Sequence, residues 1–207
     1  MPTTTSTTAR RTKGEATRRR ILERAAPVFN QRGYAGATMS ELVAATGLEK
    51  GGIYNHFGSK DDLALEAFDH SIDRMVACFA TAQEDRTGLD RLVAIVTVFG
   101  DWADDPLIPG GCPIMNTAIE SDDTHPALAD RARAAMETWH RLIGAIVKDA
   151  KQRGELDGAV DPYELATVVT ATLEGSLMLA KLFHDRSHMH RAVRYLTVHV
   201  ESLRVRP

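Results

Sequence analysis

The sequence predicts an all-α protein of about nine helices. Apolar side chains recur every three or four residues along nearly all of the 207-residue chain, which is the spacing of a helix with one buried face. No stretch longer than a few residues alternates between apolar and polar positions, as a half-buried strand would. Short runs rich in Gly, Pro and Asp separate the periodic segments, and these residues are typical of turns.

Three helices are expected before residue 60. An apolar stripe begins at Ile21 and stops at Gly33, a residue type that commonly ends helices. Pro27 lies inside this stripe, and we expect a bend there because proline removes one backbone hydrogen bond. Two short helices are predicted to follow, over residues 39–46 and 50–56.

The helices after residue 60 are expected to be longer. Their apolar stripes include residues 65–79, 89–103, 128–150 and 189–203. The last stripe advances by alternate steps of four and three residues, which is the spacing along the seam of paired helices. It consists of Met189, Val193, Leu196, Val200 and Leu203.

Capping signals mark three helix starts. In TMSE (residues 38–41) and SKDD (residues 59–62), a hydroxyl residue is followed three positions later by an acid, the pattern of a capping box. In DPYE, Asp161 is the expected N-cap and Pro162 the first helical residue. Local chemistry alone therefore predicts where three of the helices begin.

The charge of the chain is unevenly distributed. Residues 1–60 contain ten Lys or Arg against four Glu, whereas the whole chain has a net charge of −3. A basic N-terminal quarter on an acidic body suggests an end that binds a polyanion, although a solvated basic tail gives the same pattern. Residues 1–14 are expected to form a disordered basic arm.

The two cysteines, Cys78 and Cys112, have no ligand spacing, which argues against a disulfide framework and for a reducing, cytoplasmic location. No apolar signal segment is visible at the start. The most apolar run, residues 165–183, contains Glu174 and Lys181 and is barely of membrane length, so we expect a mostly buried helix and no membrane partner.

The stretch GYAGATMSELVAATGLEKGGIYNHFGSKDDL, residues 33–63, predicts a helix-turn-helix unit. Its two short helices are separated by TGLEK, where Gly47 supplies the positive φ that a tight turn needs. Five apolar side chains can close a small core beneath the helices. They are Leu42, Val43, Leu48, Ile53 and Phe57.

The start of the second short helix is a candidate phosphate contact. Lys50 and the free N–H groups near Gly51 and Gly52 favour an anion, and Lys60 can reach the same DNA backbone. The alternative is that both lysines are plain surface charges.

Three side chains on the outer face of this helix are candidates for reading base edges in the major groove: Tyr54, Asn55 and His56. The competing interpretation is that Tyr54 and His56 only pack the small domain. The basic arm, residues 10–13, is a weaker candidate for contacts in the minor groove.

With RRRILERAAPVFNQR before it, the 33–63 stretch resembles the N-terminal domain of TetR-family transcriptional regulators, over about residues 15–68. The G..Y.HF.SK..L core is specific to that family. The resemblance implies DNA binding by residues 15–60, and ligand binding and dimerisation by residues 61–207. It implies a repressor that binds a palindromic double-stranded DNA operator as a dimer and is released by a small molecule.

By position, the DNA contacts of the family fall on eight residues of this chain. They are Thr38, Lys50, Gly51, Gly52, Tyr54, Asn55, His56 and Lys60. The family often has Thr, Ser or Ala at the position of Gly52, so this chain lacks the side chain for one possible base or phosphate contact. Pro27 also departs from the common uninterrupted first helix.

A homodimer through the last two helices is expected, because one helix-turn-helix covers only a half-site. The predicted helix over residues 162–183 is apolar beyond one stripe, and burial within one chain explains only one of its faces. With the 189–203 stripe, this surface would form a four-helix interface between two chains, as the resemblance also implies.

The middle helices are expected to enclose a pocket for a small apolar effector, without a cofactor. Each candidate lining residue has ordinary core packing as its alternative. The candidates are Met75, Phe79, Phe99, Trp102, Cys112, Met115, Asn116, Ile119, Trp139, His140 and Leu173. Metal binding by HDRSHMH (residues 184–190) is conceivable, but a solvated loop is the favoured interpretation, and no metal site is expected.

Cys112 stands in PLIPGGCPIMN, at the start of an expected helix, where a thiol pKa can be lowered. It is interpreted either as a sensor of electrophiles or oxidants or as a small packing residue. An enzyme with Cys112 as nucleophile would need a positioned base, and no phosphate loop, paired carboxylate motif or HExxH is present, so an enzyme is not expected. An architectural DNA binder without effector is disfavoured by the large acidic helical part.

Overall fold

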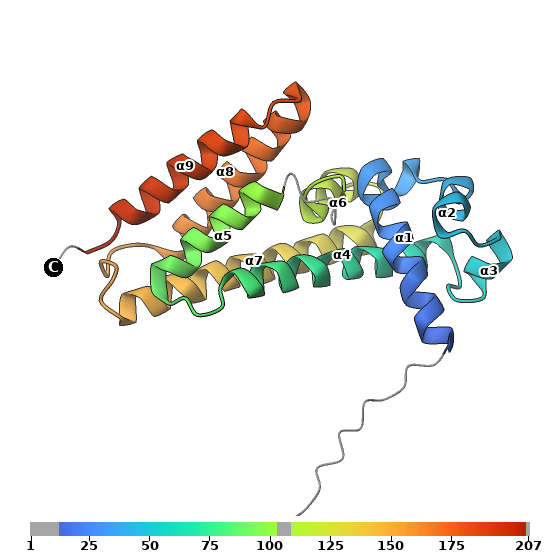
Figure 1. The fold of residues 1–207 in the computed structure, drawn as a ribbon, viewed down its shortest axis with the longest axis horizontal. Coiled ribbons are helices and arrows are strands. Elements are labelled where there is room, and N and C mark those ends of the chain that lie inside the picture. The colour runs from blue at the N-terminus through green and yellow to red at the C-terminus, as the bar shows by residue number, and fades with distance from the viewer. Residues whose placement is uncertain (1–12, 103–108, 206–207) are drawn as a thin grey trace, which may run out of the picture.

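The computed structural model describes residues 13–102 and 109–205, which form nine α-helices and no strand, as the sequence predicts (Figure 1). The helices are α1 Lys13–Gly36, α2 Met39–Thr46, α3 Lys50–Tyr54, α4 Lys60–Ala82, α5 Gly88–Trp102, α6 Pro113–Ser121, α7 Pro126–Gln152, α8 Pro162–Phe183 and α9 Ser187–Ser202. Residues 1–12 of the expected basic arm lie outside the described residues, whereas Lys13 and Gly14 belong to α1.

Helices α1–α3 and the start of α4 pack around one small core at one end of the molecule (Figure 1). The core consists of Ile21, Ala25, Leu42, Ile53, Phe57 and Leu63. Local signals set the boundaries of these helices. Thr38 and Glu41 form the predicted capping box, and Ser59 caps α4 by accepting from the N–H of Asp62.

The non-helical backbone inside α1 is at Gly33 and not at Pro27, where a bend was expected. Gly33 has φ 75° and ψ 170°, a conformation that is open to glycine and costly for other residues. A Cβ at this position would lie 2.4 Å from the Glu120 carboxylate, so Gly33 is also needed for close approach. The last turn of α1 is thereby redirected against α6.

Helix α4 connects the helix-turn-helix end to the rest of the chain. It packs on α1 at its start and on α7 and α5 further along, and Figure 1 shows α4 and α7 running side by side along the molecule. A second, much larger core of 24 buried residues lies among α4–α9. Within this core the rings of Phe79 and Trp139 lie 4.9 Å apart, and the Trp139 indole N–H donates to Thr170 Oγ1 at 2.9 Å.

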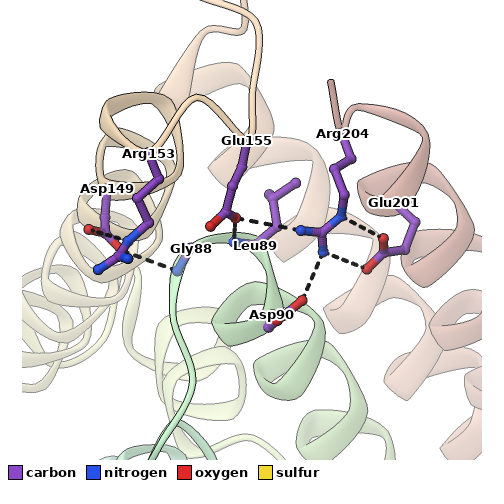
Figure 2. Close-up of polar contacts among 8 residues, drawn as sticks. All are labelled: Gly88, Leu89, Asp90, Asp149, Arg153, Glu155, Glu201 and Arg204. Atoms are coloured by element: carbon purple, nitrogen blue, oxygen red, sulfur yellow. Dashed lines mark hydrogen bonds and ion pairs between the residues drawn. The ribbon is translucent and has the colours of Figure 1, made fainter. Parts of the chain in front are cut away.

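The end of the molecule away from α3 is held by a polar cluster around Arg204 (Figure 2). Its guanidinium pairs with Asp90 at 2.8 Å and with Glu201 at 3.0 Å. The N–H of Leu89 donates to Glu155, and that of Gly88 to Asp149, so two carboxylates satisfy the start of α5. The cluster ties α5, α7 and α9 together far from the helix-turn-helix.

The apolar stripe of α9 faces inward. Met189, Leu196 and Val200 are buried in the large core of their own chain, where α9 packs on α5 and α8. The prediction that this stripe forms an interface between two chains is therefore wrong. A 4-3-4-3 spacing specifies a helix with one paired face, and that partner can be in the same chain.

Of the helices in the described residues, α8 alone has the length and composition needed to cross a membrane. However, 44% of its most apolar window is buried inside the fold. Its apolar character is therefore partly explained by packing against α7 and α9.

Candidate nucleic-acid interface and effector cavities

The turn between α2 and α3 is formed by Gly47. It has φ 69° and ψ 19°, and its N–H donates to the carbonyl of Val43, which closes the end of α2 in the left-handed conformation. Helix α3 then starts at Lys50 without a side-chain cap from Glu49. The geometry is the predicted helix-turn-helix, with α3 two residues shorter than expected.

The buried and exposed faces of α3 divide as the sequence predicts. Ile53 and Phe57 are fully buried in the small core. Lys50, Tyr54 and Asn55 are exposed on the opposite side. Because the apolar face is fixed by the core, the polar face is held outward on a rigid support, which suits a surface that enters a groove of DNA.

The remaining α3 candidates differ in their exposure. Gly51 is exposed, and a Cβ there would meet nothing within 4 Å. Gly52 is half-buried, and a Cβ there would lie 3.5 Å from Leu48, an ordinary contact distance. An Ala would therefore fit at Gly52 without strain. His56 is half-buried at the end of α3.

Thr38 and Lys60 have structural contacts inside the protein. The Thr38 N–H and the Thr38 hydroxyl both donate to the Glu41 carboxylate and hold the pKa of that carboxyl below its usual range. The Thr38 hydroxyl also accepts from the N–H of Glu41. Lys60 Nζ donates to the carbonyl of Tyr34 at 2.6 Å and lies 4.4 Å from the centre of the Tyr34 ring.

Arg18 contacts the end of α3, and sequence reasoning did not single it out. Its guanidinium lies 4.2 Å from the centre of the Phe57 ring, donates to the carbonyl of His56 and pairs with Glu66 on α4. One side chain thus joins α1, α3 and α4. In the sequence Arg18 is visible only as one positive charge in a basic run. Its partner Glu66 is 48 residues away, and a linear pattern does not indicate that pairing.

An apolar cavity of about 550 Å³ lies between α4 and α7, within the large helical part. Of the predicted lining residues, the structure brings Met75, Phe79 and Trp139 together here. The other lining residues are Phe68, Asp69, Ile72, Asp73, Val76, Ala80, Gln83, Arg131, Ala134, Ala135, Thr138 and Leu142. The volume is within the usual range for small-molecule sites, and the walls are mostly apolar.

The other predicted lining residues are distributed elsewhere. Phe99, Cys112 and Leu173 are buried in the large core, and Met115 packs against it. Asn116 lines a second cavity, of about 310 Å³, where α1, α4, α6 and α7 meet. His140 is half-buried on α7, and Ile119 is exposed on α6. The side chain of Trp102 lies outside the described residues.

Comparison with known proteins agrees with this geometry. The family model described as "Bacterial regulatory proteins, tetR family" matches residues 21–67, the part that forms the helix-turn-helix. The model described as "Tetracyclin repressor-like, C-terminal domain" matches residues 88–196, which include α5–α8 and most of α9. The chain belongs to the TetR family.

Solved structures and curated relatives from this family cover nearly the whole chain. A TetR transcriptional regulator from Chloroflexus aurantiacus is 42% identical, covers 94% of this chain and 99% of its own, and superposes with a TM-score of 0.89. One from Cytophaga hutchinsonii is 30% identical over 96% and 100%, with a TM-score of 0.86. The regulator TtgR of Pseudomonas putida is 28% identical over 85% of this chain and 86% of its own.

TetR-family proteins are DNA-binding transcriptional regulators and not enzymes, and this chain is one of them. Repression is the typical role in the family, and its members bind DNA as dimers and respond to small molecules.

An apolar face remains uncovered on α8 and α9. On α8, Val168, Met178, Leu182 and Phe183 are exposed, and Leu182 keeps 67% of its surface. On α9, Tyr195 and Val198 are exposed in the same way. We name these six residues the outer face. The expected excess of apolar surface is thus present, and on α9 it is carried by residues other than the predicted stripe.

Cys112 lies at the start of α6 but does not have the lowered pKa that this position suggests. Its side chain is buried, and burial together with the nearby Glu174 carboxyl raises the pKa of the thiol well above its ordinary value. The backbone N–H groups of Ile114 and Met115 act in the opposite direction and do not prevail. A raised pKa lowers the share of thiolate, the nucleophilic form of cysteine, and burial in the large core favours the packing interpretation of Cys112.

The histidine-containing segment after α8 shows no metal geometry. His184 has a positive φ and ends α8, while Asp185 accepts from both the N–H and the hydroxyl of Ser187. Within the described residues, no three His, Cys, Asp or Glu side chains lie close enough together to hold a metal ion.

Proposed function

We propose that this TetR-family chain is a repressor that binds a palindromic operator as a homodimer through α8 and α9 and is released by a small apolar effector. Residues 15–60 are the DNA-binding domain, and residues 61–207 bind effector and partner. Its proposed location is the cytoplasm, where the DNA is. The proposed DNA contacts are Thr38, Lys50, Gly51, Gly52, Tyr54, Asn55, His56 and Lys60.

The observation that carries the proposal is the two-sided nature of α3. Its inner face is fixed by Ile53 and Phe57, while Tyr54 and Asn55 project outward next to the exposed Lys50. An amide and a phenol can form hydrogen bonds with base edges, and an ammonium neutralises phosphate. The Lys50 ammonium also lies 5.8 Å from the centre of the Tyr54 ring, which favours one arrangement of the two side chains.

The outer face of α8 and α9 supports the homodimer. Six large apolar side chains on two adjacent helices are costly to leave in water, and a second copy covers them with the same surface. A twofold pair would place two α3 helices in successive major grooves, about 34–36 Å apart. A palindromic operator follows from that symmetry.

The cavity between α4 and α7 is the proposed effector site. Its mostly apolar lining suits an apolar molecule. Helix α4 lines this cavity and begins six residues after the end of α3, so a tilt of α4 moves the DNA-binding domain. An effector that binds the tilted conformation more tightly lowers operator affinity by the difference in its two affinities.

Fluorescence anisotropy on duplexes from the region upstream of the gene tests this function. We expect one palindromic site to bind, with Tyr54→Ala and Asn55→Ala each reducing affinity by about 5- to 150-fold, the equivalent of about 1–3 kcal/mol per base contact. The same titration with a panel of apolar compounds should reveal release. Binding to all duplexes alike, unaffected by either substitution, would contradict the proposal.

A further inference from the structure

The 310 Å³ cavity where α1, α4, α6 and α7 meet has a different chemistry from the effector cavity. We call it the junction cavity. Its walls come from both sides of the boundary between the DNA-binding domain and the rest of the chain. Aromatic rings of Phe29, Tyr34, Phe68 and His125 contribute to its lining, together with several hydroxyl and amide side chains.

A single carboxylate gives the junction cavity its charge. Glu120 lines it, and no Lys or Arg does. Both Glu120 oxygens accept from backbone N–H groups at the end of α1, from Tyr34 at 2.8 Å and Ala35 at 2.9 Å. Each oxygen retains a further lone pair, so the cavity offers acceptors to a donor group and repels an anion.

A buried polar atom in the same cavity lining has no hydrogen bond. His125 Nδ1 accepts from the N–H of Leu128, which places the proton of the neutral ring on Nε2. Nε2 is buried without a hydrogen-bond partner among the described residues, and a carboxylate oxygen of Asp61 lies 3.9 Å away. Such a donor is costly to leave unpaired, and a bound oxygen atom would satisfy it.

We propose that the junction cavity binds a small neutral hydroxylated aromatic molecule. A hydroxyl group donates to the Glu120 carboxylate and accepts from His125 Nε2–H, which an ammonium group, a carboxylate or a hydrocarbon cannot do together. The aromatic body suits walls that contain four rings. The volume is at the lower end of the range for ligand sites and restricts the molecule to a small one.

Such a ligand would act directly on the position of the DNA-binding domain. Glu120 holds the end of α1, and Asn116 Nδ2 donates to the Asn30 side-chain oxygen at 3.0 Å and to its backbone carbonyl at 3.1 Å. Asn30 in turn donates to the carbonyls of Pro109 and Gly111, before α6. Expanding the cavity separates α1 from α6 and breaks these bonds. This regulatory consequence rests on the proposed function, whereas the binding itself does not.

Isothermal titration calorimetry of the full chain with para-ethylphenol tests the binding. Thr117→Phe fills the junction cavity, and Thr138→Phe places the same substitution in the effector cavity. We expect para-ethylphenol to bind the wild type and Thr138→Phe, and to lose binding in Thr117→Phe. Absence of binding to the wild type, or loss only in Thr138→Phe, would overturn the proposal.

Charge provides a second test that does not depend on the phenylalanine variants folding. The anion para-ethylbenzoate should not bind the wild type, and Glu120→Gln should weaken para-ethylphenol while admitting para-ethylbenzoate. Equal binding of the two probes to the wild type would refute the assigned ligand class. Circular dichroism melts of each variant identify any loss of fold.

The regulatory step is tested by adding para-ethylphenol to the operator titration. We expect operator affinity to fall by about 5- to 150-fold, the usual range of coupling between two sites, in the wild type and Thr138→Phe. An unchanged affinity at saturating para-ethylphenol would overturn the regulatory step alone. A chain that binds no specific duplex at all would instead refute the proposed function, while the calorimetry would still decide the binding site.

Discussion

The two largest hydrophobic cores of this regulator differ in size and in the surfaces and cavities that they support. Six buried residues hold α3 in place, whereas 24 form the core of the α4–α9 part. The small core supports exposed polar side chains on α3, and the large helical part has a cavity between α4 and α7. A single truncation therefore removes a large share of the first core and a minor share of the second.

The largest expected effect compares two buried phenylalanines, Phe57 in the small core and Phe99 in the large one, which are 2% and 4% exposed. Truncation of each to alanine should cost about 3–5 kcal/mol. Phe57→Ala should abolish operator binding because α3 loses its support, while Phe99→Ala lowers the unfolding midpoint and leaves operator affinity of the folded protein intact. Urea unfolding and anisotropy measure both. Normal operator affinity in Phe57→Ala would contradict the expectation that operator binding depends on the small core and not on the large one.

The second comparison is between two exposed apolar residues outside either core. Leu182 on the outer face is 67% exposed, and Ile119 on α6 is 76% exposed. Leu182→Glu should convert the dimer to monomers in sedimentation and reduce operator affinity by about 10²- to 10⁴-fold, the usual gain from two linked sites. Ile119→Glu is the matched control and should leave both properties unchanged. Monomers from Ile119→Glu alone would place the interface elsewhere.

A third comparison sets a lysine of the DNA-binding domain against one on α7. Lys50 and Lys148 are both exposed. Lys50→Ala should reduce the salt dependence of operator binding by about one unit of the logarithmic slope, because one phosphate contact is lost. Lys148→Ala should leave the slope unchanged. Equal salt-dependence slopes for Lys50→Ala and the wild type would show that Lys50 makes no phosphate contact.

The smallest effect concerns Glu174 in the α4–α9 part. Burial raises the pKa of this carboxyl above its ordinary value of 4.5. Its hydrogen bond with Cys112 and the charge of Lys181 lower the pKa by less than burial raises it. A raised pKa in the folded state means that its favourable contribution is present below about pH 4.5 and is lost as pH rises through the folded pKa. Glu174→Gln should therefore stabilise the protein at neutral pH and less at pH 4. Melting curves across pH measure this, and a stabilisation that is largest in acid would contradict it.

The two parts also differ in how much of them the sequence predicts. The boundaries of α2 and α4 depend on Thr38, Gly47 and Ser59, which act within four residues of their own position. Such signals are visible in a linear sequence. The exposed face of α3 is predicted in the same way, because the buried Ile53 and Phe57 define the opposite face.

Contacts between distant segments were the ones that sequence reasoning missed. The partner of the α9 stripe was assigned to another chain, because spacing does not say which helix covers a face. The thiol pKa of Cys112 is raised by burial and by Glu174, which is 62 positions away on α8. The junction cavity arises from the packing of four helices, and of its lining only Asn116 was anticipated as a ligand contact.

The central claim is that α3 reads one half-site while α8 and α9 join two chains, and half-site binding tests it most directly. The measurement is a titration of the wild type against its palindromic operator and against a duplex with one half scrambled, with stoichiometry from sedimentation. The account predicts two chains on the palindrome and an affinity for the single half-site that is about 10²- to 10⁴-fold weaker. One chain per duplex with equal affinity for both would contradict it.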